Sequence, residues 1–325
     1  MSDVPNRLLD AAFRGDTRSG TKTVMALIDA GASLTDVIED VLAPVQREVG
    51  ERWLRNEWSV ADEHRVTAVV DAALAAAALS ARLPTPTLGR MLCVCAEGEW
   101  HTIAARMGAA LLSSEGWEVI FLGGSVPPLQ LADALRFERP DAVGIHVSLP
   151  MHLPGAGRTV EVVRAADLHV AVAGRAVDGS PQRASALRAT HIVERGRLVA
   201  IEPGNGAAPG NEVDLVRTEV DLVSASEDEI VNAAFQQLVS RDGVTAELSA
   251  SHRQRTVEDL RYMVRHLTAA AALGDPTIWT DFYRWLVDVL VARGVPEVAA
   301  ERGFEAVAEA LRPTAPKLVS IARDT

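Results

Sequence analysis

An alternation of strand-like and helix-like segments over residues 89–203 constrains the fold of this chain more than any other feature. Short apolar runs rich in branched residues are separated by stretches with apolar residues at helical spacing. These runs are residues 90–95, 118–122, 142–147 and 169–173, with a weaker one at 191–193. Strands joined by helices predict right-handed crossovers and a parallel sheet. We therefore expect a doubly wound, flavodoxin-like domain over residues 88–203, with its ligand at the carboxyl ends of the strands.

Helical patterns flank this domain on both sides and predict an α/β plus all-α protein. Helices are expected over residues 5–14, 23–30, 34–53 and 60–82. Ser33 and Ser59 precede the last two and are suitable N-caps. Because the connections are short, these helices should be antiparallel neighbours in a four-helix bundle. Residues 211–325 are again helical, so we expect three domains, 1–84, 88–203 and 211–325.

The chain has 325 residues, with 32 Lys and Arg against 44 Asp and Glu, a net charge of −12. An anionic surface repels a phosphate backbone, so we expect no nucleic-acid partner. No apolar stretch approaches the roughly 20 residues that a membrane span needs, and no signal-peptide core is visible at the N-terminus. We therefore expect a cytoplasmic protein without a membrane partner. It lacks a nucleophile–base pair, a Walker loop and a zinc-ligand spacing, so we do not expect an enzyme.

A histidine follows the first expected strand, where ligands of doubly wound domains bind. Glu99 precedes His101 by two positions and could hydrogen-bond one nitrogen of its ring. Such a bond would set the tautomer and the basicity of an axial metal ligand. The alternative, from these residues alone, is a partly exposed loop histidine without a ligand.

This loop resembles the acid-x-His-x-x-Gly loop of cobalamin-binding domains, with Ala104 in place of the usual Gly. The loops at residues 123–127, 147–150 and 173–176 resemble that family in the same order along the chain. The resemblance implies that His101 is the lower ligand of cobalt and that the nucleotide tail enters a slot beside the sheet. It also implies that further loop residues contact the cobalamin: Glu99, Trp100, Thr102, Ile103, Gly123, Ser148, Leu149, Gly174 and Arg175.

Trp53 is followed, after nine residues, by Glu63 and His64, which resembles the Trp-x9-Glu-His signature of the CarH-type light sensors. The resemblance implies a bundle that caps adenosylcobalamin, with Trp53 and Glu63 on the adenosyl group. In that family a further histidine ligates cobalt after light, and His64 is the nearest candidate for this donor in the present sequence. The alternative is that Trp53 is bundle core and Glu63 a solvated helix start. Leu54 stands where that family has a histidine. No helix-turn-helix precedes the bundle, so we expect no DNA-binding output.

In the last block, Arg255, Asp259, Tyr262 and His266 recur at spacings of three and four and share one helix face. Arg and His suit propionates and Asp suits pyrrole N–H groups, while an ordinary charged helix face is the alternative. The order of the three domains resembles that of the photocobilins, in which a globin-like domain binds biliverdin. The resemblance implies that these four residues and Tyr283 contact a bilin. No cysteine follows Cys95, so biliverdin would be bound non-covalently.

Together these features predict a cobalamin-dependent photoreceptor, in which photolysis of adenosylcobalamin changes the arrangement of the domains or the oligomeric state. We expect a homo-oligomer, a dimer, that signals to a protein partner. Two alternatives stay open. A corrinoid methyl carrier of a methyltransferase system would share the bundle and the histidine loop, and a haem-binding globin-like sensor would use His252 or His266 as the iron ligand.

Overall fold

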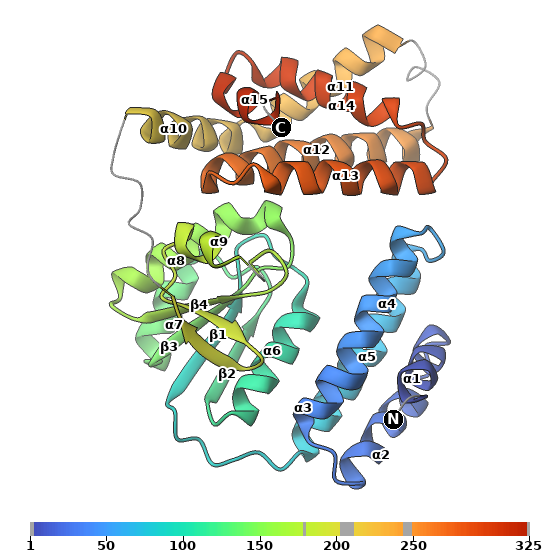
Figure 1. Ribbon diagram of the computed structural model, residues 1–325, viewed down its shortest axis with the longest axis vertical. Helices are drawn as coiled ribbons and strands as arrows, with labels where there is room; N and C mark the ends of the chain where they lie inside the picture. The colour runs from blue at the N-terminus through green and yellow to red at the C-terminus, as the bar shows by residue number, and fades with distance from the viewer. Residues whose placement is uncertain (1–2, 178–179, 202–210, 243–248, 324–325) are drawn as a thin grey trace. The chain divides into compact units, whose positions relative to one another are not determined.

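The computed structural model describes residues 3–177, 180–201, 211–242 and 249–323 (Figure 1). Its contacts divide the chain into two compact units. The first unit is Met1–Ser148, Arg158–Asp178 and Ala189–Ile201, and it holds the N-terminal helices and the sheet. The second unit is Leu149–Gly157, Gly179–Arg188 and Glu202–Thr325, so two short segments between strands group with the C-terminal helices.

The N-terminal helices form the expected bundle. Their bounds are α1 Val4–Phe13, α2 Thr17–Asp29, α3 Leu34–Val37, η1 Ile38–Leu42, α4 Ala43–Leu54 and α5 Val60–Ser80. Both expected N-caps are confirmed as capping boxes, Ser33 with Asp36 and Ser59 with Asp62. Each serine side chain accepts from the backbone N–H of its aspartate, whose carboxylate accepts from the serine N–H. Apolar faces of all these helices meet in one buried cluster.

Two details of the bundle differ from the expected helices. α2 begins at Thr17, not at residue 23, because the Asp16 side chain accepts from the Ser19 N–H and starts the helix earlier. Gly20 is therefore helical: a Cβ there would lie 2.6 Å from Val69 Cγ1, so glycine allows close packing of α2 on α5. The third expected helix contains the π-helical turn η1, in which the Ala43 N–H bonds to the Ile38 carbonyl.

The sheet confirms the doubly wound, flavodoxin-like prediction. Its strands are β1 Arg90–Cys95, β2 Glu118–Gly123, β3 Ala142–His146, β4 His169–Ala173, β5 His191–Glu194 and β6 Arg197–Ala200. They run in the order β2-β1-β3-β4-β5-β6, parallel except for β6. The expected set of strands ended at residue 193 and missed β6. Arg195 and Gly196 both have positive φ, which makes the tight hairpin that adds this antiparallel edge.

The connections between strands are α6 Thr102–Ser114, α7 Pro128–Glu138, η2 Pro150–His152, α8 Leu153–Ala165 and α9 Pro181–Ala186. α6 connects the bundle to the sheet. Met107 on α6 belongs to the bundle core, and Arg106 forms an ion pair with Asp71 of α5. These contacts hold the N-terminus of α6, and with it His101, against the bundle.

The second unit is helical. Its C-terminal helices are α10 Asn211–Ala225, α11 Glu227–Asp242, α12 Ala250–Leu273, α13 Thr277–Ala292, α14 Val298–Leu311 and α15 Pro316–Arg323. α12 packs against α10, α11, α13, α14 and α15 and is the central helix of this unit. Among the described residues, no helix is both long and apolar enough to cross a membrane.

Candidate functional site

The candidate site starts from a buried carboxylate. Glu99 is 0% exposed, and its Oε1 lies 2.6 Å from His101 Nδ1 while also accepting from the His101 N–H at 2.9 Å. A carboxylate oxygen accepts, so Nδ1 carries the proton and Nε2 carries the lone pair. The His101 side chain is 52% exposed. The imidazole therefore presents, at the end of β1, a nitrogen lone pair to which none of the described residues donates a hydrogen bond.

The other carboxylate oxygen connects this loop to the one after β3. Glu99 Oε2 accepts from the Ser148 N–H at 2.7 Å. The loop after β2 joins through Ser125, whose N–H donates to the Glu99 carbonyl at 2.8 Å and whose Oγ accepts from the Gly98 N–H at 3.0 Å. Three loops that are far apart in sequence thus meet on one acidic residue, as the carboxyl ends of neighbouring parallel strands allow.

The charges around His101 favour the protonated, positively charged form of its imidazole beside Glu99. The hydrogen bond that His101 donates to Glu99 raises the pKa of His101, and burial acts against it. The charge of Glu63, on the first turn of α5, raises the same pKa. These charges therefore favour protonation of the imidazole, and any metal ion at Nε2 would compete with that proton.

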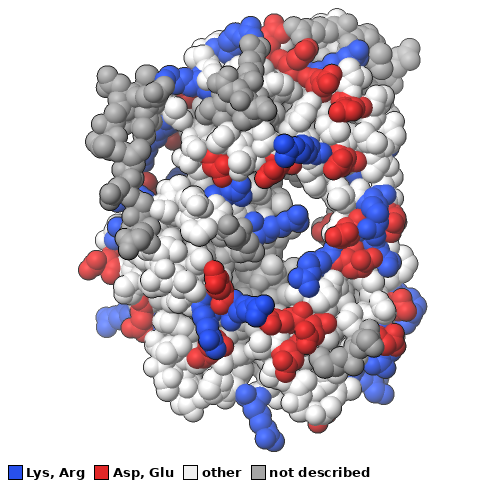
Figure 2. Space-filling view, viewed as in Figure 1, with Lys and Arg blue, Asp and Glu red and all other residues white. Residues whose placement is uncertain are grey.

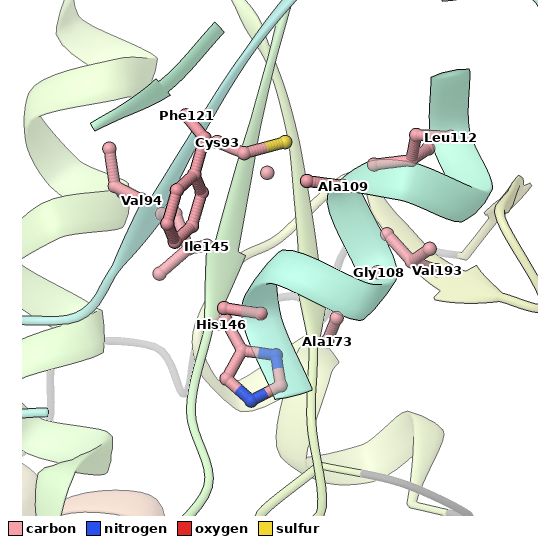
Figure 3. Close-up of a pocket in the computed structure, with 12 residues that line it drawn as sticks. Cys93, Val94, Gly108, Ala109, Leu112, Phe121, Ile145, His146, Ala173 and Val193 are labelled. Atoms are coloured by element: carbon pink, nitrogen blue, oxygen red, sulfur yellow. The ribbon is translucent and has the colours of Figure 1, made fainter. Parts of the chain in front are cut away.

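A narrow slot lies between the sheet and α6, beside the histidine loop (Figure 3). Its free volume is only about 30 Å³. It is lined by Cys93, Val94, Ala105, Gly108, Ala109, Leu112, Phe121, Gly144, Ile145, His146, Ala173 and Val193. A Cβ built on Gly108 would meet nothing within 4 Å, so the helix itself leaves room on this side. Small residues on α6 and on the strands, Ala105, Gly108, Ala109, Gly144 and Ala173, make up part of this lining.

The turn after β4 requires glycine for the packing of the chain itself. Gly174 has a φ of +104°, and a Cβ there would lie 2.4 Å from the Val147 carbonyl oxygen. Any other residue would be strained and would clash with backbone. Gly123 also has a positive φ, whereas Arg175 is exposed.

On the bundle side, the structure shows which tryptophan belongs to the bundle core. Trp58, not Trp53, is part of the buried cluster and stacks on Phe13. Trp53 is half-buried at the end of α4, and Glu63 is half-buried on α5. His64 is exposed. The charge of Glu63 acts on His101, and no such effect of His64 is found among the described groups.

Sequence reasoning missed two polar groups near these elements. The Gln46 side chain on α4 accepts from Thr67 Oγ1 at 3.3 Å, but its buried Nε2 has no hydrogen-bond partner among the described residues. Gln46, Gly50 and Trp53 follow each other at spacings of four and three on one face of α4. An unpaired amide donor on the face that carries Trp53 fits a polar ligand there. The only signal in the sequence was this spacing.

The other loop candidates differ in how far their side chains are exposed. Trp100 is 73% exposed. Thr102 and Ile103 are half-buried on the first turn of α6, and Leu149 is half-buried at the start of the second unit.

The C-terminal candidates do not form one open face. Arg255 and Tyr262 are exposed, while His266 is only 6% exposed, bonds to the Tyr262 carbonyl at 2.8 Å and stacks on Phe282 with ring centroids 3.7 Å apart. Asp259 is half-buried, and burial raises its pKa to about 6. It has no hydrogen bond among the described residues, although Arg293 and Arg255 lower its pKa.

Tyr283 belongs to a different group of side chains. Its ring packs near Trp279, with centroids 5.7 Å apart, and near Phe304 of α14, at 6.4 Å. Tyr283 therefore contacts residues of α13 and α14, whereas the ring of His266 stacks on Phe282. His252, the alternative iron ligand, is exposed near the start of α12.

Comparisons with known proteins bear on the first unit. Residues 89–200 match the model of a B12 binding domain, and residues 4–77 match a second B12 binding domain model. The HTH-type transcriptional repressor CarH of Myxococcus xanthus is 38% identical over 108 residues, or 33% of this chain. The matched part spans 35% of the length of that repressor.

Among solved structures, a monomethylamine corrinoid protein of Methanosarcina barkeri has a similar fold. It aligns with a TM-score of 0.52 and 15% identity, over 60% of this chain and 94% of that protein. At this identity the match shows the fold alone. The two B12 binding domain models, which cover the bundle and the sheet, support a cobalamin cofactor for this chain.

Proposed function

We propose that this protein is a cobalamin-dependent photoreceptor, and not an enzyme, whose cofactor is adenosylcobalamin held between the bundle and the sheet. The observation that carries the proposal is the buried Glu99, which holds His101 Nδ1 at 2.6 Å and leaves Nε2 free at the end of β1. A ligand histidine whose second nitrogen donates to a carboxylate is fixed in tautomer and orientation. In this role His101 is the lower cobalt ligand.

The bundle supplies the groups for the upper side. When bound, adenosylcobalamin contributes a cobalt–carbon bond that visible light breaks. The half-buried indole of Trp53 would pack on the adenosyl group, and the Glu63 carboxylate would accept from ribose hydroxyls. His64, which is exposed, is our candidate cobalt donor after illumination. The similarity to a CarH repressor supports this role, although it covers a third of this chain.

We further propose that the second unit holds biliverdin non-covalently. Arg255, Tyr262, His266 and Tyr283 are candidate contacts, and Asp259 is the strongest of them, because a half-buried carboxylate without a hydrogen bond can accept from pyrrole N–H groups. A bound bilin would need His266 to leave its stack on Phe282 or to contact the pigment only at its edge.

The output would be a change of domain arrangement in a homodimer. Loss of the adenosyl group removes what Trp53 packs on, so the two ligand states favour different positions of the bundle. A protein partner would read this change. On the face shown in Figure 2, acidic and basic side chains are interspersed, which suits a protein partner better than a nucleic acid.

The test is absorption spectroscopy of the full chain, reconstituted in the dark with adenosylcobalamin and biliverdin and then exposed separately to green and to red light. We expect corrin bands that change irreversibly with green light and a red-absorbing bilin band. Binding of the corrin without binding of biliverdin would contradict the proposed bilin site and leave the proposal of a cobalamin photoreceptor intact. A preference for methylcobalamin without any light response would replace the photoreceptor by a methyl carrier, and an iron-type Soret band would indicate haem.

A variant of the cap separates its role from corrin binding. Trp53→Ala should keep cobalamin binding and lose the light-dependent change of oligomeric state, measured by size-exclusion chromatography before and after illumination. Trp58→Phe, in the bundle core, is the matched control for the loss of an indole. A Trp53→Ala variant that responds to light as the parent does would contradict the cap role.

A further inference from the structure

The slot between the sheet and α6 has a clear chemical character. β3 alternates its side chains, so that Ala142, Gly144 and His146 face α6, and β4 adds Ala171 and Ala173 on the same face. Most of the lining is small or apolar. None of the lining residues is Asp, Glu, Lys or Arg. This surface suits an uncharged, planar ring and excludes a phosphate.

His146 is the one strongly polar side chain of this lining. Its ring lies at the end of the slot beside Ala173, and its Cε1 would be 2.9 Å from a Cβ on Gly174 (Figure 3). Burial lowers the pKa of His146 to about 4, so the imidazole is neutral at physiological pH and has one donor and one acceptor nitrogen. Burial likewise raises the pKa of the Cys93 thiol to about 12 and keeps it neutral.

The partner of one imidazole nitrogen is known, and the other nitrogen has none. His146 Nε2 lies 3.1 Å from Ser148 Oγ, and a hydroxyl can donate to it. Nδ1 has no hydrogen-bond partner among the described residues. With the Ser148 hydroxyl donating to Nε2, Nδ1 carries the proton. In this tautomer the slot contains one N–H donor for which no described residue supplies an acceptor.

We propose that His146 determines which nucleotide base the cobalamin site accepts, by donating a hydrogen bond from Nδ1 to a ring nitrogen of the base. This rests on the proposed cobalamin function and names the ligand class more closely. The base is a planar heteroaromatic ring with a free nitrogen lone pair, such as a benzimidazole or a purine. A benzimidazole nitrogen that His101 has displaced from cobalt is such an acceptor. A phenolic base of similar shape has no ring nitrogen and would leave the donor unpaired.

The slot must widen for a ring to enter, because its free volume is about 30 Å³. Gly108 and the alanines on α6 carry little side chain toward the slot, so the movement required is of the helix or of Phe121. Ser148 connects this event to the metal ligand. Its side chain contacts His146 and its N–H donates to Glu99, so it is the positioning residue between base and cobalt ligand.

The test measures binding of three probes to the full-chain apoprotein by equilibrium dialysis: benzimidazolyl cobalamin, a p-cresolyl cobamide with a phenolic base, and cobinamide, which has no base. The parent should bind the benzimidazolyl form about 5- to 150-fold more tightly than the phenolic form, since an unsatisfied donor costs about 1–3 kcal/mol. His146→Leu should bring this ratio close to one. His146→Gln, which keeps an N–H donor, should restore part of it and covers the case that the leucine variant does not fold.

His169→Leu is the matched control, because His169 is an exposed histidine at the opposite, amino-terminal end of β4. It should leave the ratio unchanged. A parent that binds none of the probes would overturn the proposed function itself. A parent that binds both cobamides equally, or a His146→Leu variant with the parent's ratio, would overturn the role of His146 and leave the cobalamin site intact.

Discussion

Two carboxylates are buried among the described side chains, and each organises one region of the molecule. Glu99 is 0% exposed in the loop region of the sheet, and Glu219 is 9% exposed in the C-terminal helices. Glu99 binds two backbone N–H groups and the ring of His101. Glu219 binds the N–H groups of Lys317 and Leu318 at the start of α15, at 3.0 and 3.1 Å from Oε2.

The difference between the two lies in what the carboxylate leaves free. Glu219 satisfies the first N–H groups of a helix, which is a capping interaction and stabilises the fold. Glu99 also satisfies backbone donors, but it additionally orients an imidazole that is half exposed to solvent. A buried carboxylate therefore indicates a ligand site only where it orients another side chain that can still bind a ligand, as the imidazole of His101 can through Nε2.

The largest effect should come from His101→Ala. Without the imidazole, no nitrogen ligates cobalt from below, so the spectrum of histidine-bound cobalamin should be lost completely. His64→Ala should keep the dark-state spectrum, because His64 acts only after illumination in our proposal. If the spectrum of His101→Ala is identical to that of the parent, His101 does not ligate cobalt, and Glu99 does not orient a cobalt ligand.

The buried histidine of the second unit should respond to acid in the opposite way to His101. Burial lowers the pKa of His266 to about 4, so its neutral form is the one the fold accommodates. Stability is therefore present above the unfolded pKa of about 6.5 and is lost as the pH falls toward 4, by on the order of 3 kcal/mol. Urea unfolding at pH 7 and pH 4 measures this loss. His266→Phe should reduce it, and His252→Phe, at an exposed site, should not.

Glu99→Gln should weaken cobalamin binding by about 10- to 100-fold, the usual cost of losing a partner of a ligand histidine. The amide keeps the shape of the side chain but no longer raises the pKa of His101. Isothermal titration with cobalamin measures the effect. If binding falls less than twofold, the imidazole does not depend on this carboxylate.

Glu219→Gln should leave cobalamin binding unchanged and lower the free energy of unfolding by about 1 kcal/mol, because a charged cap is replaced by a neutral one. Thermal unfolding of the apoprotein measures it. A change in cobalamin affinity comparable to that of Glu99→Gln would break the comparison between the two regions.

Much of the first unit could be predicted from sequence, because its signals are local. The capping serines Ser33 and Ser59 and the pair Glu99–His101 are separated from their partners by two or three residues. The hydrogen bond between Glu99 and Ser148 was predictable only in part. Ser148 was expected in the site, but it contacts Glu99 through its backbone N–H, which every residue except proline possesses. A side-chain pattern cannot identify such a donor.

The parts that were missed depend on tertiary packing. His146 lies inside a strand, and only the register with β1, where it pairs with Cys95, places it on the α6 face. In the second unit, helical spacing grouped Arg255 with His266 correctly on one helix, but it could not show that Phe282 covers the His266 ring. Tyr283, one residue further along α13, packs toward α14 instead. Neighbours in sequence on a helix point about 100° apart, so adjacent residues serve different contacts.

The π-helical turn η1 also determines which changes in chain length the bundle can tolerate. Its i→i+5 bond accommodates one residue more than an α-helical turn does, between the N-cap at Ser33 and the indole of Trp53. Loss of a single codon within Ile38–Leu42 would convert it to a regular turn and keep Trp53 on its present face. Loss of a codon between Ala43 and Arg52 would instead rotate Trp53 by about 100° around the helix axis. Viable one-residue deletions upstream of Trp53 should therefore be concentrated at this turn.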